Sequence, residues 1–505
     1  MNFLTNLWKP HVAKSSKVII GMLMACATIT SSTIGFDTSM MNGLNILPSY
    51  TEYFQITNTT KGLSTSATYI GGILAALSFP HFVEHLSRRT ALLLAATVTL
   101  LFIVLQTASQ NIAMFVVSRI GLGYGKSCTT IVAPTYLAET LPHKYRGWGL
   151  GLINDFYYVG ALVAAGVTYR TADFNSTWAW RLPSLLQGFW SILCICILPF
   201  VPESPRWLIS HGRNEEALQV LAQVNSNGDD SDPLVLAQHR EIINTIRHDN
   251  STMGNMSFTE IIRNRSVIKR LSLVFSCSLG TVVVGSQIAS YYFGTMLDNA
   301  GITDTTTQLQ INIILNAWCL LCGLFGTYLA DIIGRRTSAL LSTILLTIFL
   351  YLIGVFVKLY GHSSDKSGIY ATVAFMFLFM GSYSLGWTPL TYLYPPEVLN
   401  YAIRAQGMGL NNWTFYSFGL TLTFAFPFAL DAMGWKAYIM NASWNVLLIV
   451  FIYFKWVETK GKTLEEIDAA FDDVEYTDGL SMDQLEAGKV DLKELPAEVL
   501  EKEDH

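Results

Sequence analysis

Charged side chains are scarce in this sequence. Asp, Glu, Lys and Arg make up only 14% of its 505 residues, whereas 51% are hydrophobic. A soluble domain carries about 25% charged residues, so the scarcity excludes a chain that buries its apolar residues in one soluble core. The formal net charge of −5 also provides no basic surface, and we therefore expect no nucleic-acid partner.

Signatures of enzymes are absent as well. The sequence contains no His-rich metal cluster, no nucleophile elbow and no phosphate-binding loop, so we expect no enzyme activity, no metal and no cofactor. It has only seven cysteines, an odd number that falls within apolar stretches and argues against a disulfide framework. Cys319 and Cys322 have the spacing of a redox or metal motif, but within an apolar helix we interpret them as packing residues.

Long apolar stretches are what the sequence has instead. Twelve of them approach the roughly 20 residues that a helix needs to span a bilayer. They form two groups of six, separated by a polar stretch, near 18–41, 63–83, 90–109, 112–138, 147–168 and 181–201, and near 270–294, 309–333, 337–360, 369–394, 403–430 and 434–457. This pattern predicts an all-α polytopic membrane protein with twelve transmembrane helices.

The distribution of basic residues predicts the orientation of the chain. Lysines cluster before the first span and after the last, and flanking basic residues tend to stay in the cytoplasm, so we expect both termini there. Sequons at Asn58 and Asn175, on the opposite side, predict glycosylation. We expect five segments: a cytoplasmic N-terminus (1–17), a first six-helix bundle (18–201), a cytoplasmic linker with amphipathic helices (202–269), a second six-helix bundle (270–457) and a cytoplasmic acidic tail (458–505).

A pattern of acids and arginines occurs once in each half. An acid precedes two arginines by four and five residues at Glu84 and again at Asp331, and a glutamate precedes an arginine by seven residues at Glu139 and again at Glu397. Such matches in the same order indicate a duplicated six-helix unit. We interpret these residues as a cytoplasmic gate of ion pairs; the alternative is that they only set topology. The gate set is Glu84, Arg88, Arg89, Glu139, Arg146, Glu203, Arg206, Asp331, Arg335, Arg336, Glu397, Arg404 and Glu458.

Several motifs together resemble one known family. PESPRWL, APTYLAETLPHKYRG, ADIIGRR and VETKGKTLEEI are similar to motifs of the sugar porter family of the major facilitator superfamily. TWAWRLPSLLQ, SYYFGTMLDNAGIT and INIILNAW look most like its fungal lactose and cellodextrin permeases. The resemblance implies two pseudo-symmetric six-helix bundles around a central cavity, and sugar transport by alternating access, commonly as proton symport. We expect a monomer in the plasma membrane whose partners are a sugar, a proton and the lipid bilayer.

The resemblance also implies some of the sugar-contacting positions. Asn154 corresponds to the family's fifth-helix glutamine, and Tyr392 to its tenth-helix tryptophan. The eleventh-helix Asn-Trp pair is Asn412 and Trp413, while the seventh-helix pattern has lost both glutamines and has Gln287 in place of its asparagine. Amides that bond hydroxyls and flat aromatic faces that stack on a pyranose suit a polyol. The candidate binding residues are Asn154, Asp155, Gln287, Tyr291, Tyr292, Asn316, Trp318, Tyr392, Asn412 and Trp413.

An aspartate lies deep in the first apolar stretch. Asp37 is 20 residues beyond Lys17, and Arg119 is 20 residues before Glu139, so at about 1.5 Å per residue both lie roughly 30 Å from the cytoplasmic boundary. Either charge is costly inside a membrane, and pairing reduces both penalties. The resemblance implies that Asp37 and Arg119 are the proton-coupling pair; a static structural ion pair is the alternative.

A second charged pair is expected nearby. Lys126 lies seven residues after Arg119, on roughly the same face of its helix. Asp155 lies on the next helix at a depth that differs by about 6 Å, so we expect Lys126 and Asp155 to form a structural pair. The alternative is that Asp155, beside Asn154, helps to select an unusual polar substrate.

Three functions remain open on the sequence. The leading one is a proton-coupled transporter of a hexose or a disaccharide. A sugar sensor on the same scaffold is the second, because a site without the family's glutamines could bind without turnover. A transporter of a polyol-like or glycosylated metabolite is the third.

Overall fold

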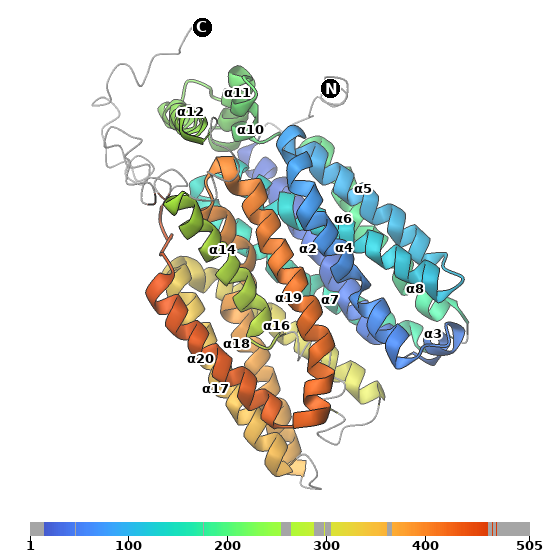
Figure 1. Cartoon of the computed structure of the whole chain (residues 1–505). Coiled ribbons are helices and arrows are strands. Elements are labelled where there is room, and N and C mark those ends of the chain that lie inside the picture. The colour runs from blue at the N-terminus through green and yellow to red at the C-terminus, as the bar shows by residue number, and fades with distance from the viewer. Residues whose placement is uncertain are drawn as a thin grey trace.

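Two groups of long helices make up the molecule (Figure 1). The computed structural model describes residues 15–45, 47–174, 176–253, 264–286, 297, 305–360, 366–462, 467 and 471, and the regular structure within these ranges is entirely helical. The first bundle consists of α2 (Ser16–Leu44), α4 (Asn58–His85), α5 (Arg88–Thr107), α6 (Ile112–Thr140), α7 (His143–Thr171) and a sixth span formed by α8 (Trp178–Leu186) and α9 (Gly188–Ile197). The short α3 (Pro48–Tyr53) follows α2, and the 3-10 turn η1 (Leu198–Phe200) follows α9.

The second bundle repeats this arrangement. It consists of α14 (Arg265–Val283), α16 (Thr305–Ile333), α17 (Arg335–Tyr360), α18 (Lys366–Val398), α19 (Arg404–Met433) and α20 (Lys436–Lys455), with the 3-10 turn η2 (Tyr401–Ile403) before α19. Ten of the described helices are long and apolar enough to cross a membrane by composition alone. The two expected spans outside that set are α19 and α6, and α6 carries Arg119, Lys126 and Glu139. The predicted fold class, twelve transmembrane helices in two bundles, is confirmed.

Side-chain caps set the starts of several spans. Thr57 and Thr60 form a reciprocal capping box at the start of α4, and Ser87 and Asn111 accept backbone N–H groups at the starts of α5 and α6. Each cap satisfies donors that the first turn of a helix leaves without an internal partner. The short connections between these helices are therefore specified by local sequence.

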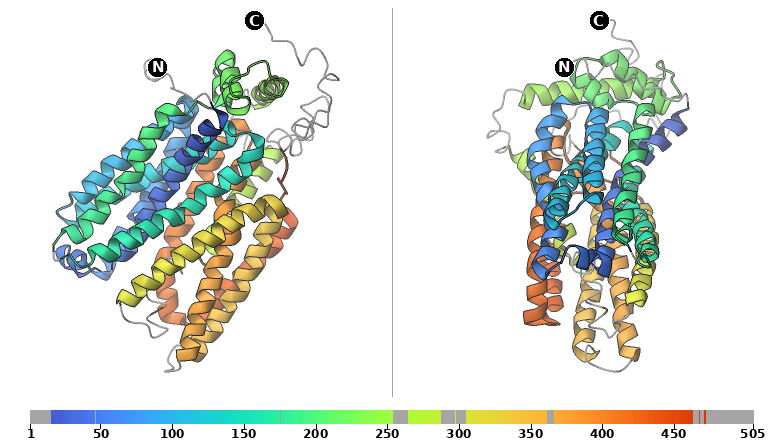
Figure 2. Two further views of the ribbon diagram at one scale, coloured as in Figure 1. Left: turned by 180° about the vertical axis from the view of Figure 1, so that it is seen from behind. Right: turned by 90° about the vertical axis from the view of Figure 1, so that its right-hand side faces the viewer.

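Between the two bundles in the sequence, the structure describes three further helices. They are α10 (Pro205–Ser210), α11 (Asn214–Asn225) and α12 (Pro233–Met253). All three lie together across one end of the two bundles (Figure 2). We call this end the linker end, and the opposite end the far end.

The two bundles meet along α4, which packs on α19, and along α7, which packs on α16 and α18. Within the first bundle, α2 and α7 approach so closely that a Cβ added at Gly35 would lie 1.8 Å from the carbonyl oxygen of Tyr157. Small residues allow such close approach of helix backbones in membranes. This tight contact fixes α2 and α7 next to each other, and residues of both helices line a cavity.

Candidate functional site

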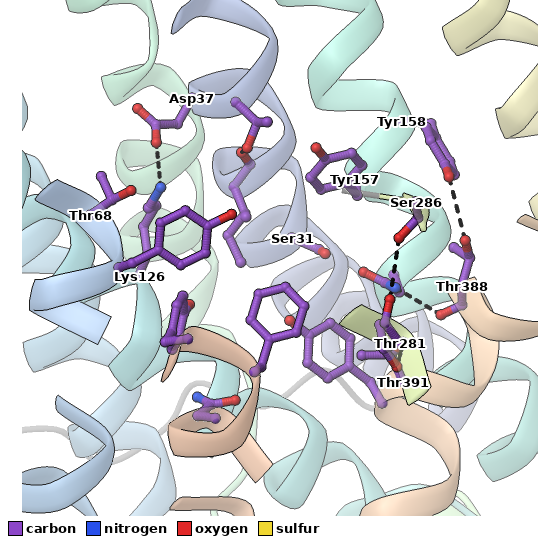
Figure 3. Close-up of a pocket in the computed structure, with 18 of the residues that line it drawn as sticks. Ser31, Asp37, Thr68, Lys126, Tyr157, Tyr158, Thr281, Ser286, Thr388 and Thr391 are labelled. Carbon is purple, nitrogen blue, oxygen red and sulfur yellow. Dashed lines mark hydrogen bonds and ion pairs between the residues drawn. The ribbon is translucent and has the colours of Figure 1, made fainter. Parts of the chain in front are cut away.

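A cavity with many polar side chains lies between the two bundles, and helices of both halves line it. Figure 3 shows charged residues on one side and the hydroxyl groups of Tyr158, Ser286, Thr388 and Thr391 on the other. The first bundle contributes Ser31, Ile34, Asp37, Thr38, Met41, Thr65, Thr68, Tyr69, Arg119, Lys126, Asn154, Tyr157 and Tyr158. The second contributes Thr281, Ser286, Met380, Tyr383, Thr388, Thr391, Tyr392, Asn411, Asn412, Phe415 and Tyr416.

Asp37 is the centre of the charged side of the cavity. Its Oδ1 lies 2.9 Å from Nη1 of Arg119, and its Oδ2 lies 3.4 Å from Nη2 of the same guanidinium. Arg119 also donates through Nε to the carbonyl oxygen of Ser64, at 2.8 Å. Asp37 and Arg119 are only 1% and 2% exposed. The structure therefore brings together the two residues that the depth argument placed at one level.

Lys126 joins this pair, which differs from the sequence expectation. Its ammonium group bonds Oδ2 of Asp37, whereas the sequence predicted a bond to Asp155. Asp155 instead accepts a hydrogen bond from the hydroxyl of Thr327 on α16, at 2.6 Å, and does not line the cavity. The physical reason is that Lys126 and Arg119 share one face of α6, so both reach the same carboxylate on α2. The shared helix face of Lys126 and Arg119 therefore indicates the partner of Lys126 better than its similar depth to Asp155 does.

Two of the four amides predicted to bind substrate lie at the cavity, although each already has a protein partner. Asn154 donates to the carbonyl oxygen of Thr388 at 2.8 Å, and Asn412 donates to the carbonyl oxygen of Ser127 at 3.1 Å. Both bonds cross from one bundle to the other. Tyr392 also lines the cavity. These three residues are placed where they can contact a bound molecule.

Other predicted binding residues lie elsewhere. Trp318 is 38% exposed and donates to the carbonyl oxygen of Phe377, and Asn316 donates to the carbonyl oxygen of Asn312 one turn away. Neither lines the cavity, and Trp413 and Asp155 do not line it either. Residue type alone does not tell which way a helical side chain faces, and this is why these assignments differ from the structure. Three further candidates, Gln287, Tyr291 and Tyr292, lie outside the described residues.

Sequence reasoning missed several residues of the lining. Tyr157 and Tyr158 follow Asn154 by three and four residues, so the helical period would have placed them on the same face of α7. No comparable signal distinguished Tyr383 or Asn411. Asn411 is 2% exposed and lines the cavity, and its side-chain oxygen has no hydrogen-bond partner in the described structure.

The linker end of the first bundle is held by a network around Glu139. This carboxylate accepts from Nε and Nη2 of Arg88, at 3.2 and 3.3 Å, and from the hydroxyl of Ser204 at 2.6 Å. Glu203 accepts from the backbone N–H groups of Ser204 and Arg89, at 3.0 and 3.3 Å. Burial raises the pKa of Glu203, and these hydrogen bonds oppose the increase.

The second bundle repeats this network around Glu397. Glu397 accepts from Nε and Nη2 of Arg335, at 3.2 and 3.0 Å, and from the hydroxyl of Thr459 at 2.7 Å. Glu458 accepts from the backbone N–H groups of Arg335 and Arg336, at 2.7 and 3.1 Å. Glu397 thus stands where Glu139 stands in the first half, and Glu458 stands where Glu203 stands.

Several contacts of the described residues cross between the halves at the linker end, among them three that involve predicted gate residues. Nη1 of Arg404 lies 3.4 Å from Oε1 of Glu139, and both side chains are fully buried. Arg146 donates to the carbonyl oxygen of Lys462 at 2.7 Å. A Cβ added at Gly147 would lie 2.4 Å from Oδ1 of Asp331, which itself lies 3.1 Å from Nη1 of Arg335. The gate residues that the sequence grouped therefore meet at one end.

The structure describes the remaining predicted gate and glycosylation residues only in part. Arg206 is buried in α10 at the linker end. The side chains of Glu84 and Asn58, and all of Asn175, lie outside the described residues. Within the described ranges, no group of three or more His, Cys, Asp or Glu side chains has the arrangement to hold a metal ion.

Comparison with known proteins assigns the chain to a family. The family model described as sugar (and other) transporter matches residues 23–471. The chain belongs to this family. It is therefore a multi-pass membrane transporter and not an enzyme. The MFS-type transporter oryC of Aspergillus oryzae is 30% identical over 93% of this chain and 88% of its own length. A high-affinity glucose transporter of Kluyveromyces lactis is 29% identical over 91% of this chain and 85% of its own length.

Solved structures of the family share the fold. The proton:xylose symporter XylE bound to 6-bromo-6-deoxy-D-glucose superposes with a TM-score of 0.79 over 90% of this chain and all of that chain, at 21% identity. The inward open conformation of XylE from E. coli superposes with a TM-score of 0.65 over 89% of this chain and 99% of that chain, at 20% identity. The arrangement of the helices is thus more similar to the first of these two structures.

Proposed function

We propose that this protein carries a saccharide across the plasma membrane by alternating access, and that proton binding at Asp37 is coupled to this movement. The observation that carries the proposal is the buried pair of Asp37 and Arg119, because it lines the cavity between the two halves. Ionisable residues inside a membrane protein mark substrate or proton pathways when they face a cavity. The neutral amides, hydroxyls and aromatic rings of the lining suit the ring and hydroxyl groups of a sugar.

The proposed orientation places the linker end in the cytoplasm. The buried bond between Arg404 and Glu139 then closes the cytoplasmic side of the cavity, and the saccharide enters from the far end. Buried ion pairs of this kind can separate as a group, because their desolvation cost offsets much of their attraction. Opening the linker end would release the saccharide into the cell.

The proposed coupling acts through the carboxylate of Asp37. Arg119 and Lys126 favour its ionised form, and a proton that enters from outside neutralises it. Neutral Asp37 holds the two cations less strongly, so α2 and α6 can rearrange around the bound saccharide. Loss of the proton to the cytoplasm restores the cluster and resets the cycle.

The names of the relatives support this cargo. The K. lactis relative is a glucose transporter, and XylE is a proton:xylose symporter. Hexoses and disaccharides are therefore the first substrates to test, as the sequence motifs also suggest.

Uptake into cells that lack their own saccharide transport tests the proposal. Radiolabelled glucose, glucuronate, lactose and cellobiose are supplied with and without a protonophore. We expect at least one to accumulate above its outside concentration, and the protonophore to reduce this to equilibration. Accumulation that survives the protonophore would overturn the coupling. Absence of uptake of every saccharide by protein present at the cell surface would overturn the transport function.

A further inference from the structure

The formal charges of the side chains that line the cavity do not sum to zero. Asp37 contributes one negative charge, whereas Arg119 and Lys126 contribute two positive charges. The other described residues of the lining are neutral side chains. The lining therefore carries a formal charge of +1, and both oxygens of the single carboxylate are already shared between the two cations.

This excess charge matters most when the cavity closes around its cargo. Lys126 is only 6% exposed, and water in an open cavity beside it would screen the excess charge. Once water is displaced, an unbalanced charge in a low-dielectric interior is strongly unfavourable unless an opposite charge accompanies it. A neutral sugar brings no such charge, whereas a sugar that carries one carboxylate lowers the charge of the lining by one, to zero while Asp37 is ionised.

Proton uptake by Asp37 increases the difference between a neutral and an anionic cargo. If Asp37 takes up a proton and the cargo is neutral, the loaded site has a charge of +2, because Arg119 and Lys126 then face each other without an anion. If the cargo is a monoanion, the loaded site keeps the charge of +1 that the empty site already has. Cotransport of a proton with a monoanion therefore adds no net charge to the buried cluster.

We propose that the substrate is an acidic saccharide, a sugar ring that bears one carboxylate, and that Lys126 together with Arg119 binds this carboxylate when Asp37 is protonated. This inference rests on the proposed transport function and names its substrate class. Proton uptake by Asp37 frees the donors of both cations, and the substrate carboxylate replaces Asp37 as their acceptor. Charge-assisted bonds from an ammonium and a guanidinium group are the usual means of holding a carboxylate.

The geometry provides separate places for the two ends of such a molecule. Lys126 and Asp37 lie on one side of the cavity, and Tyr158, Ser286 and Thr388 lie across it (Figure 3). Asn411 also lines the cavity, and its buried side-chain oxygen has no hydrogen-bond partner in the described structure, so a rotation of the side chain would offer it to a hydroxyl group of the ring. The carboxylate would bind at the first side, and the hydroxyl groups of the ring at the second.

Matched neutral and acidic sugars test the proposal in proteoliposomes that contain the purified full-length protein. The pairs are glucose with glucuronate and galactose with galacturonate, under an inward proton gradient. We expect KM for each uronate to be at least about tenfold below that of its neutral partner, the size of one charge-assisted hydrogen bond. Uptake of the uronate should also be insensitive to an imposed membrane potential, because a proton and a monoanion carry no net charge.

Variants of Lys126 test whether the preference for uronates depends on the charge of this side chain. Lys126→Met removes the charge at nearly constant side-chain size and leaves Asp37 with Arg119, so the cluster becomes neutral. We expect it to reverse the preference between each uronate and its neutral partner, whereas Lys126→Arg should keep the wild-type preference. Thermal stabilisation of the purified protein by each sugar gives a binding readout, and Lys126→Gln provides a second uncharged variant if the methionine variant does not fold.

The outcomes distinguish a failure of the acidic-substrate proposal from a failure of the proposed transport function. Efficient uptake of neutral sugars with no preference for uronates, or an equal loss for both sugars in Lys126→Met and Lys126→Gln, would overturn the acidic substrate and leave the proposed transport function standing. If neither member of any pair binds or moves, the acidic substrate is overturned, and the proposed transport function fails as well only if lactose and cellobiose are also not taken up.

Discussion

The two halves of this transporter have the same framework at the linker end and different chemistry at the cavity. Around Glu139 and around Glu397, one carboxylate holds an arginine and a hydroxyl group with almost the same geometry. At the cavity, all the charged side chains of the described lining come from the first half. The two copies of the duplicated unit thus have the same network at the linker end, whereas only the first copy has charged side chains in the described cavity lining.

The two linker-end networks differ in whether their central glutamate bonds the opposite half. Glu139 accepts from Arg404 of the opposite half, in addition to Arg88 of its own half. Among the described residues, the hydrogen bonds and ion pairs of Glu397 go to Arg335 and Thr459, both within the second half. Glu139 therefore joins the halves, whereas Glu397 braces one of them.

The largest effect is expected from Asp37→Asn, which removes the one negative charge of the described cavity lining. Arg119 and Lys126 then face each other without an acceptor of opposite charge, and the cluster charge rises to +2. Breaking a buried ion pair costs about 3–5 kcal/mol of stability, and asparagine cannot take up and release the proton, so we expect the accumulation ratio to fall to about one, the value at equilibration. Uptake against a gradient, normalised to protein at the cell surface, measures this.

A double variant separates loss of coupling from loss of folding. Asp37→Asn combined with Lys126→Met has a cluster charge of +1, the same as the wild type. We expect it to recover expression and thermal stability relative to Asp37→Asn, and still to fail to accumulate substrate. Accumulation by the double variant equal to that of the wild type would show that Asp37 does not couple the proton to transport.

The next effect concerns the asymmetry at the linker end. Glu139→Gln weakens the bond to Arg404 of the other half, so we expect the linker end to open more often. Spin labels at the exposed positions His85 on α4 and Ile332 on α16 report this distance by double electron–electron resonance. We expect the open population to rise by about tenfold, as for a loss of roughly 1.4 kcal/mol.

Glu397→Gln is the matched control, because it disturbs the equivalent network without removing a described bond between the halves. We expect a smaller shift in the same distance distribution. If both variants shift the distribution equally, the crossing bond to Arg404 is not what holds the linker end closed.

The sequence predicted the framework well because framework signals are local or repeated. Apolar runs of suitable length predicted the twelve spans, and the matched spacing of acids and arginines predicted which residues meet at the linker end. The meeting of Asp37 with Arg119 also followed from the sequence, because two costly charges at one depth have a strong reason to pair.

The cavity was predicted less well because its lining depends on helix rotation, which a single sequence constrains weakly. Trp318 and Asn316 have suitable chemistry but lie on other faces of α16. Lys126 was assigned to Asp155 by depth, although its place on the Arg119 face of α6 was visible in the sequence. Asn411 was overlooked beside Asn412, and only the structure shows that its neighbour bonds α6 while Asn411 lines the cavity with its oxygen unpartnered.

A smaller effect is expected in the neutral half of the cavity. Asn411→Ala removes an acceptor that has no partner within the described structure, so its loss costs only a bond to substrate. A neutral hydrogen bond is worth about 0.5–1.5 kcal/mol, and we expect KM to rise by roughly 2- to 10-fold. The rise should be the same for glucose and for glucuronate, because this side of the cavity contacts the ring. A selective loss of glucuronate uptake would contradict the division between the charged and neutral sides.

The smallest effect is expected from Asp155→Asn, at the contact between α7 and α16. The described bond of Asp155 comes from the hydroxyl of Thr327, and an asparagine oxygen can accept the same bond. We expect thermal stability and transport to change little, by less than about 1 kcal/mol in unfolding free energy. Asp155→Ala should cost about 1–3 kcal/mol more, because the Thr327 hydroxyl is then buried without an acceptor. Thermal unfolding of the two purified variants compares them. If Asp155→Asn keeps its stability and yet loses accumulation, the carboxyl group itself takes part in proton movement, and the charged chemistry of the first half extends beyond Asp37, Arg119 and Lys126.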